Sequence, residues 1–207
     1  MFGNRTRAQP FVNVVVPTWG GRPKIVLLFA SPLFVPHDGV VAFAPSHVTW
    51  ANVGPCDDGR LRPCRSSWTL DGHPLPFVPY DDDVEVTTDP PAFLPVYRQS
   101  LRTFAREAQA ARIPVERIFG DVLLVAGGDD QVWPAADSAR EIEARRTAYG
   151  LPTTVVTHPA AGHRVILPGE QVADGGMRMA RGGSEAADRA LGELAWPEIA
   201  RVLGSRV

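Results

Sequence analysis

The second half of the chain alternates between apolar stripes with helical spacing and short runs suited to strands. Residues 97–112 carry an apolar residue every three or four positions, which predicts a helix. Residues 121–126, DVLLVA, form an apolar run typical of a strand buried on both faces. Residues 134–149 predict the next helix, with a proline in the first turn and a glycine just past the end. Residues 153–157, TTVVT, are β-branched throughout and predict another strand.

A last helix is expected to begin after Ser184, which is a good N-cap residue, and to stop at Gly204. Pro197 lies inside this segment and should kink or divide the helix after Trp196. Helices and strands therefore alternate from residue 97 onward. This pattern predicts an α/β fold with a mostly parallel sheet flanked by helices.

The first half of the chain is less regular. Short hydrophobic runs at residues 11–16, 25–30 and 40–44 are separated by prolines and glycines, and each is strand-like. Helix and strand both remain open for residues 24–31. Residues 51–95 are rich in proline and are interpreted as an irregular insertion, because structureless loops of that length are uncommon inside a compact domain.

Composition indicates a folded protein and excludes some classes of function. Hydrophobic residues make up 44% of the 207 residues, which is enough for one domain with its own core. The net charge of −2 gives no general attraction to nucleic acid or to an anionic membrane. The longest apolar run, residues 25–30, is far shorter than a membrane span, and no secretory signal pattern is present. We therefore expect a cytoplasmic protein without nucleic-acid or membrane partners. The sequence pattern does not predict whether the protein is a monomer or an oligomer.

Metal binding is not expected from the residues that usually provide it. Cys56 and Cys64 are the only cysteines, whereas a zinc site would need about four ligands, so we expect two free thiols. Asp81–Asp83 form an acidic group that could bind a cation. A solvated turn is the favoured interpretation, because no calcium-loop pattern surrounds these residues.

Candidate catalytic side chains follow the two strands predicted in the second half. Asp129 and Asp130 come after residues 121–126, and His163 comes after residues 153–157. Catalytic groups of parallel α/β sheets collect beyond the carboxyl ends of the strands. An acid after one strand and a histidine after the next match the last two members of an α/β-hydrolase triad. In that chemistry the carboxylate orients the imidazole, which deprotonates the nucleophile.

Simpler interpretations of these residues remain open. Asp129 or Asp130 could only cap the helix that follows them. His158 is an alternative base, but it lies closer to the strand and directly before Pro159, so His163 is favoured.

Five segments of the chain form a more specific combination. They are VVAFAPSHVTW (residues 40–50), RSSWTLDGHPLPFVPYD (65–81), IPVERIFGDVLLVAGGDDQVWP (113–134), HPAAGH (158–163) and AADRALGELAWPEIARVLG (186–204). Together they resemble the C-terminal catalytic domain shared by acyl-CoA thioesterases and bile-acid-CoA:amino-acid N-acyltransferases. The resemblance extends over residues 26–204.

The resemblance implies an α/β-hydrolase fold and a role in fatty acyl-CoA metabolism. The acyl group of an acyl-CoA thioester would pass to a Ser or Cys nucleophile and then to water or an amino acid, with no cofactor besides the CoA of the substrate. Asp130 matches the triad acid, His163 matches the base, and Asp129 is the second choice for the acid. Trp133 is a candidate substrate-binding residue because it follows Asp130 closely, although packing is the commoner role of such a tryptophan. An esterase or peptidase of the same fold is an alternative, because the fold and an acid–histidine pair do not select the substrate.

The nucleophile region departs from the family pattern. The family places Ser or Cys in a tight turn before a helix that VLLFAS (residues 26–31) resembles, so the turn should fall in residues 17–23. These residues contain neither Ser nor Cys, and the aligned position falls on or near Gly20. We therefore expect residues 1–25 to be an atypical N-terminal segment and residues 26–207 to form the family-like domain.

Three interpretations fit this departure. The chain could be a truncated or frame-shifted family member, an active enzyme with a substitute nucleophile, or a non-catalytic protein that binds acyl-CoA or a partner. Thr18 is the substitute nearest in sequence, and Ser31 and Ser46 are further choices, with turn packing the favoured role for Ser46.

Two glycine pairs flank the sequence MRMAR near the end of the chain. A phosphate cradle for CoA, with Arg178 and Arg181 beside it, is one interpretation of Gly175–Gly176 and Gly182–Gly183. A mobile loop is favoured, because isolated glycine pairs are weak evidence for phosphate binding.

Overall fold

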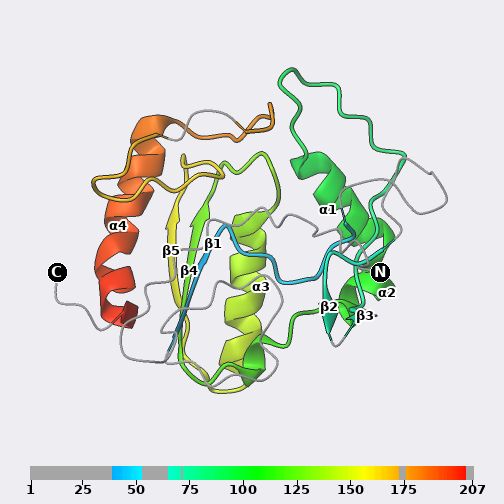
Figure 1. Ribbon diagram of the computed structural model, residues 1–207, viewed down its shortest axis with the longest axis horizontal. Coiled ribbons are helices and arrows are strands. Elements are labelled where there is room, and N and C mark those ends of the chain that lie inside the picture. Colours follow the sequence, from blue (N-terminus) through cyan, green and yellow to red (C-terminus); the bar gives the residue numbers. More distant parts are fainter. Residues whose placement is uncertain (1–38, 53–64, 71, 173–175, 204–207) are drawn as a thin grey trace, which may run out of the picture.

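A three-stranded parallel sheet lies at the centre of the computed structural model, which describes residues 39–52, 65–70, 72–172 and 176–203. The strands follow the order β1 (Gly39–Phe43), β4 (Asp121–Gly127) and β5 (Thr154–His158), and both neighbouring pairs are parallel. Helices α3 (Ala135–Ala148) and α4 (Glu185–Leu203) lie on opposite sides of the sheet (Figure 1). The predicted α/β fold with a parallel sheet and flanking helices is confirmed.

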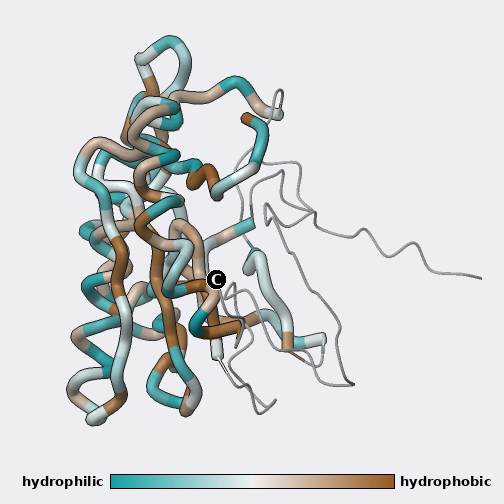
Figure 2. Tube along the Cα trace, turned by 90° about the vertical axis from the view of Figure 1, so that its left-hand side faces the viewer, coloured by the Kyte–Doolittle hydropathy of each residue, from teal (hydrophilic) through white to brown (hydrophobic). Residues whose placement is uncertain are grey.

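The core is built on both faces of β4. Leu123, Leu124 and Val125 have no solvent exposure, as expected for a central strand covered on two sides. Alternate side chains of β4 join two separate hydrophobic clusters, one with α3 and one with α4. Figure 2 shows the same concentration of hydrophobic residues along the central strands. The apolar run of residues 121–126 thus has the environment that its sequence predicts.

The predicted helix over residues 97–112 is two helices in the structure. Helix α1 (Leu94–Thr103) begins earlier than expected, and α2 (Ala105–Ala110) follows after a break at Phe104, whose ψ of 44° is not helical. Phe104 packs on a small cluster of three buried residues, Val48, Val78 and Ala111. The apolar spacing therefore predicted helical structure correctly. It did not predict the break at Phe104, where the backbone changes direction and the side chain packs on its cluster.

Pro197 does not divide the last helix, so that prediction is wrong. Helix α4 continues from Glu185 to Leu203 through Pro197, which lies on the exposed side. Packing of Leu191, Ala195 and Ile199 on the sheet stabilises both halves of the helix. The loss of one backbone hydrogen bond at the proline is therefore tolerated. Ser184 caps this helix as predicted, since its hydroxyl accepts the Ala187 N–H at 3.3 Å.

The insertion contains little regular structure in its described part. A hairpin of two-residue strands, β2 (Thr69–Leu70) and β3 (His73–Pro74), precedes the long excursion to α1. A short 3-10 helix, η1 (Val115–Arg117), leads into β4. No helix in the described part of the chain is long and apolar enough to cross a membrane.

Several predicted features lie outside the described residues. They are the strand-like runs at residues 11–16 and 25–30, the expected nucleophile turn at residues 17–23 with Thr18 and Gly20, Ser31, both cysteines, Gly175 and Gly204.

A buried arginine organises the end of the sheet where the strands begin. Arg146 of α3 has no solvent exposure, and all five of its N–H donors are used. Its Nε donates to Thr153 Oγ1 at 2.8 Å. The remaining donors bind backbone carbonyl oxygens of Val115, Ile118, Gly120 and Pro152. One side chain therefore joins η1, the approach to β4 and the approach to β5.

Candidate active site

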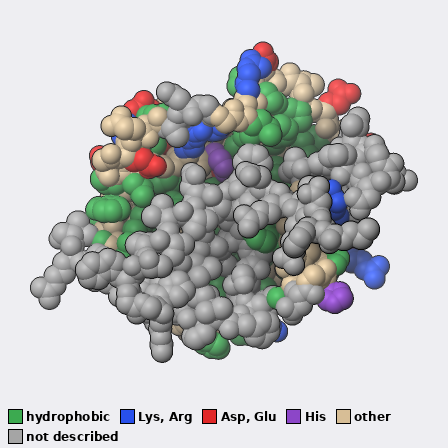
Figure 3. Space-filling view, in the orientation of Figure 1, with side chains coloured by type: hydrophobic (Ala, Val, Ile, Leu, Met, Phe, Trp, Pro, Cys, Tyr) green, Lys and Arg blue, Asp and Glu red, His purple; other side chains and the backbone are tan. Residues whose placement is uncertain are grey.

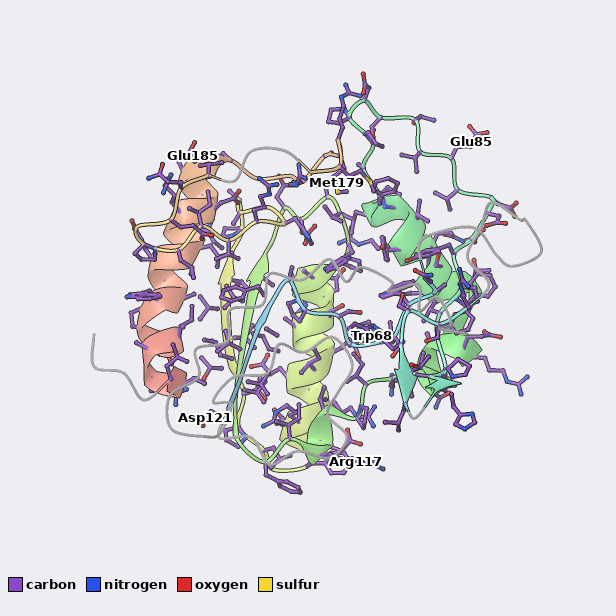
Figure 4. All side chains as sticks on the ribbon, in the orientation of Figure 1. Trp68, Glu85, Arg117, Asp121, Met179 and Glu185 are labelled. Carbon is purple, nitrogen blue, oxygen red and sulfur yellow. The ribbon has the colours of Figure 1, made fainter. Side chains whose placement is uncertain are left out.

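The predicted acid and base lie at the carboxyl ends of neighbouring strands. Asp130 follows β4, and His163 follows β5. Because β4 and β5 are parallel and adjacent, both loops leave the sheet at the same edge. Figure 4 labels Asp121, the first residue of β4, at the opposite edge, and Met179 near the edge that carries the loops.

Asp130 and His163 form a direct hydrogen bond. The distance between His163 Nδ1 and Asp130 Oδ2 is 2.9 Å. The Asp130 side chain is 2% exposed and that of His163 is 23% exposed. A carboxylate in its ionised form only accepts hydrogen bonds, so in this contact Nδ1 is the donor and Nε2 is the ring nitrogen that does not face Asp130. A carboxylate that binds an imidazole in this way is able to orient it for proton transfer.

Backbone groups fix the carboxylate of Asp130. Its Oδ1 accepts the N–H of Val132 at 2.8 Å and that of Trp133 at 3.2 Å. The N-cap position of α3 is Pro134, and no side chain caps this helix. The helix-capping interpretation of Asp129 and Asp130 is therefore wrong, and the carboxylate of Asp130 is held by its own turn with one oxygen left for His163.

Asp129 bonds to a different loop. Its Oδ2 accepts the N–H of Gly183 at 2.9 Å, and its Oδ1 accepts the side-chain N–H of Gln131 at 2.7 Å. The neighbouring Arg181 carbonyl accepts the N–H of His163 at 2.8 Å and that of Gln131 at 3.4 Å. Residues 181–183, called the clasp below, therefore join the loop that carries the acid to the loop that carries the base.

The two glycines of the clasp are required by conformation and by space. Gly182 and Gly183 have φ of +68° and +67°, a region that favours glycine. A Cβ on Gly182 would lie 1.6 Å from the carbonyl oxygen of Asp129, and one on Gly183 would lie 2.2 Å from the nitrogen of Gly162. The sequence favoured a mobile loop here, whereas residues 181–183 are packed against the loops that carry Asp130 and His163.

A second carboxylate, from helix α4, binds the loop that carries His163. Asp188 in the first turns of α4 is 8% exposed, and its Oδ1 accepts the N–H of Gly162 at 2.7 Å. Burial raises the pKa of Asp188, while the Gly162 N–H and the charge of Arg164 act in the opposite direction. Asp188 therefore fixes the residue directly before His163.

Aromatic side chains extend from His163 into the insertion, and we call Trp50, Tyr80, Tyr97 and Trp133 the aromatic row. Trp133 lies edge-to-face with His163, with ring centroids 4.9 Å apart and planes at 90°. Tyr97 contacts Trp133 at 6.0 Å, and Tyr80 and Trp50 follow behind it. Burial raises the pKa of both Tyr97 and Tyr80, so their hydroxyls stay protonated. In the space-filling view, a histidine reaches the surface at the loop-bearing edge of the sheet, beside arginine side chains (Figure 3).

Other residues singled out in the sequence have local contacts. His158 Nδ1 accepts the N–H of Ala160 at 3.3 Å, so His163 rather than His158 is the partner of Asp130. The Ser46 hydroxyl donates to Val48 O at 2.8 Å and accepts the indole N–H of Trp50 at 3.0 Å, which is a turn and packing role. Arg178 forms an exposed ion pair with Asp89.

The acidic group in the insertion is part of a turn. Asp81 is buried, and its carboxylate accepts the hydroxyl of Thr103 and, at 3.0 Å, the N–H of Asp83. Among the residues that the structure describes, no group of three or more His, Cys, Asp and Glu side chains is arranged to hold a metal ion.

Comparison with known proteins identifies the family. A family model described as BAAT / Acyl-CoA thioester hydrolase C terminal matches residues 62–203. The chain belongs to this family. A separate comparison with curated proteins found no match.

The matched range of the BAAT / acyl-CoA thioester hydrolase domain contains Asp130, His163, the clasp and most of the aromatic row. Its α/β-hydrolase-like character agrees with the parallel sheet seen here. The sequence singled out Arg181 and Gly182–Gly183 only as a possible phosphate cradle, and it did not predict their contacts with the two loops or the bond from Gly162 to Asp188. Backbone partners far away in the chain leave no pattern in the sequence. The available signal for Asp188 was its place as an acidic residue in the first turns of the last helix.

Proposed function

We propose that this chain acts on acyl-CoA thioesters, as a hydrolase or acyltransferase of fatty acyl-CoA metabolism, through Asp130 and His163. The observation that carries the proposal is the 2.9 Å hydrogen bond between these side chains at the carboxyl edge of the sheet. A buried carboxylate beside a partly exposed imidazole is the acid–base half of a nucleophilic acyl-transfer site. Membership of the acyl-CoA thioester hydrolase family supports a thioester substrate.

The proposed reaction has two halves. Nε2 of His163 removes the proton of a nucleophilic hydroxyl as that oxygen attacks the thioester carbonyl carbon. The C–S bond then breaks, and Nε2–H returns the proton to the sulfur of CoA. Water or the amine of an amino acid next attacks the carbonyl carbon of the acyl ester and gives a proton to Nε2. The bond between the acyl carbon and the hydroxyl oxygen then breaks, and Nε2–H returns the proton to that oxygen. The reaction requires no cofactor besides the CoA of the substrate.

The hydroxyl nucleophile is the part of the proposal that needs assignment. Thr18 and Ser31 are the two hydroxyls to test, since Ser46 is bonded within its own turn. Release of the CoA thiol from a series of acyl-CoA substrates is the direct assay.

Variants of the acid–base pair test the mechanism. His163→Ala should lower kcat/KM by about 10²–10⁴, the range expected for loss of a general base. Asp130→Asn should have a similar effect, because an amide N–H facing Nδ1 favours the wrong tautomer of His163. His158→Ala is the matched control and should retain activity. Thiol release that persists in both His163→Ala and Asp130→Asn would refute the proposed roles.

A second candidate function is non-catalytic binding of acyl-CoA. It is favoured by the lack of Ser and Cys at residues 17–23, where the family pattern places the nucleophile. Calorimetry with a non-hydrolysable thioether analogue of acyl-CoA separates the two: binding without thiol release supports this candidate. Hydrolysis of oxygen esters or peptides, with thioesters untouched, would instead support an esterase or peptidase.

The proposed setting is the cytoplasm, with acyl-CoA as a small-molecule partner. The net charge of −2 supports this setting over attachment to nucleic acid or to an anionic membrane surface. Fractionation of cells that express the chain tests it.

A further inference from the structure

We infer that Trp133 is a positioning residue for the acid–base pair, which keeps the imidazole of His163 turned so that Nδ1 faces Asp130. The inference deepens the proposed function and rests on it for the chemistry, but its physical content concerns only the orientation of one ring.

Trp133 first contacts the acid through its backbone. Its N–H donates to Asp130 Oδ1 at 3.2 Å, beside the shorter bond from Val132. These two bonds occupy Oδ1, so Oδ2 is the oxygen that accepts from His163. The backbone N–H groups of Val132 and Trp133 therefore fix the orientation of the carboxylate toward His163.

The side chain of Trp133 then contacts the base. The indole and imidazole planes are perpendicular, with centroids 4.9 Å apart. This is the edge-to-face geometry that aromatic pairs prefer, and it restricts rotation of the smaller ring. A half-turn of the imidazole about its bond to Cβ would exchange Nδ1 for a carbon and break the bond to Asp130. The indole disfavours such rotation by occupying the space on one side of the ring.

The indole itself is fixed from two directions. Its Nε1–H donates to the carbonyl oxygen of Ala44 at 3.1 Å, at the carboxyl end of β1. Among the described residues Ala44 is the one non-glycine residue with positive φ, 43°, so this turn adopts a backbone conformation that is uncommon for alanine. Tyr97 packs against the indole at 6.0 Å with an interplanar angle of 72°. The ring that restrains His163 is therefore itself held by β1 and by α1.

These contacts favour positioning over the substrate-binding role expected for Trp133. The polar edge of the indole is occupied by Ala44, and its ring is shared between Tyr97 and His163. A tryptophan that binds an acyl chain would present its ring to an open pocket. Trp133 instead connects three parts of the site: the acid, the base and the end of β1.

The experiment measures the tautomer of His163 in the protein without substrate. Nitrogen-15 NMR at alkaline pH, where imidazole side chains are neutral, distinguishes a proton on Nδ1 from one on Nε2. In the wild type we expect the Nδ1–H form to predominate. In Trp133→Leu we expect the ratio of Nδ1–H to Nε2–H to fall by about three- to tenfold, the range that one aromatic pair supports.

Two further variants make the result interpretable. Trp133→Phe keeps an aromatic ring beside His163 and loses the bond to Ala44, so its ratio should lie between those of the wild type and Trp133→Leu. Trp196→Leu removes a tryptophan from the cluster between α4 and the sheet, and it should leave the ratio at the wild-type value. A ratio unchanged in both Trp133 variants overturns the inference, whatever happens to acyl-CoA affinity. Because no substrate is present, this outcome is independent of whether the chain hydrolyses or binds acyl-CoA.

Discussion

Replacing Gly182 by alanine should separate the two loops that carry the acid and the base. The φ of +68° costs about 1–2 kcal/mol for an L side chain. The added Cβ would also lie 1.6 Å from the carbonyl oxygen of Asp129, so one of the loops must move. Overpacking of this kind costs about 1–3 kcal/mol. We therefore expect Gly182→Ala to lower the free energy of unfolding by about 2–5 kcal/mol, the sum of the two effects.

Gly169 provides a matched control for the backbone part of this cost. It has φ of +80°, and a Cβ built on it has no heavy atom within 4 Å. Gly169→Ala should therefore lose only about 1–2 kcal/mol. Urea unfolding followed by circular dichroism gives both values, with the slope m showing whether the unfolded surface is comparable.

The difference between the two variants isolates the contact of the clasp with Asp129. Gly182→Ala should also weaken the bond between Asp130 and His163, which the NMR tautomer ratio reports directly. Equal losses of stability in Gly182→Ala and Gly169→Ala would refute the reasoning, because they would show that the clasp yields without cost.

Two other predictions concern buried charges. Arg146→Met should lower the free energy of unfolding by about 3–5 kcal/mol, because four carbonyl oxygens and a hydroxyl lose their buried donor. Arg140→Met, on the exposed side of the same helix, should change the free energy of unfolding by less than about 0.5 kcal/mol in the same urea experiment. Similar losses in both variants would contradict this prediction. Burial raises the pKa of Asp188, so the folded state disfavours its charge, and the stability of the wild type should fall relative to Asp188→Asn as pH rises from below the unfolded value of 3.8 through the raised pKa. Unfolding curves of both proteins between about pH 3 and pH 7 test the sign, since the side-chain carbonyl of the variant's amide would still accept the N–H of Gly162. A wild type that gains stability relative to the variant over that range would show the sign to be wrong.

The sequence predicted the parts of the fold that local pattern determines. Strands β4 and β5 and helix α3 each have a continuous signal, and the structure places their bounds within two residues of those expected. The break at Phe104 and the uninterrupted course of α4 through Pro197 were not predicted, because both depend on packing against residues distant in the chain. Local propensity is overridden at such positions by tertiary contacts.

The site was also predictable only in part from the sequence. The contact between Asp130 and His163 followed from strand order, since parallel neighbours bring their carboxyl ends together. Arg146 was missed, although it lies four positions after Ile142 on the buried stripe of α3. An arginine on an apolar stripe signals a buried group of acceptors, but the acceptors here are mostly backbone carbonyls, which no sequence pattern marks.

The clasp has a consequence for the chain between His163 and Arg181. The N–H of His163 binds the carbonyl of Arg181, so the two ends of this connection are fixed to each other as well as to the site. When both ends of a flexible loop are fixed, the entropy of closing the loop depends only weakly on its length. Doubling the length would cost only about 0.6 kcal/mol. Gly169 and Glu170 are exposed within it. Extra residues inserted at Gly169 or Glu170 should therefore leave the hydrogen bond between Asp130 and His163 unchanged.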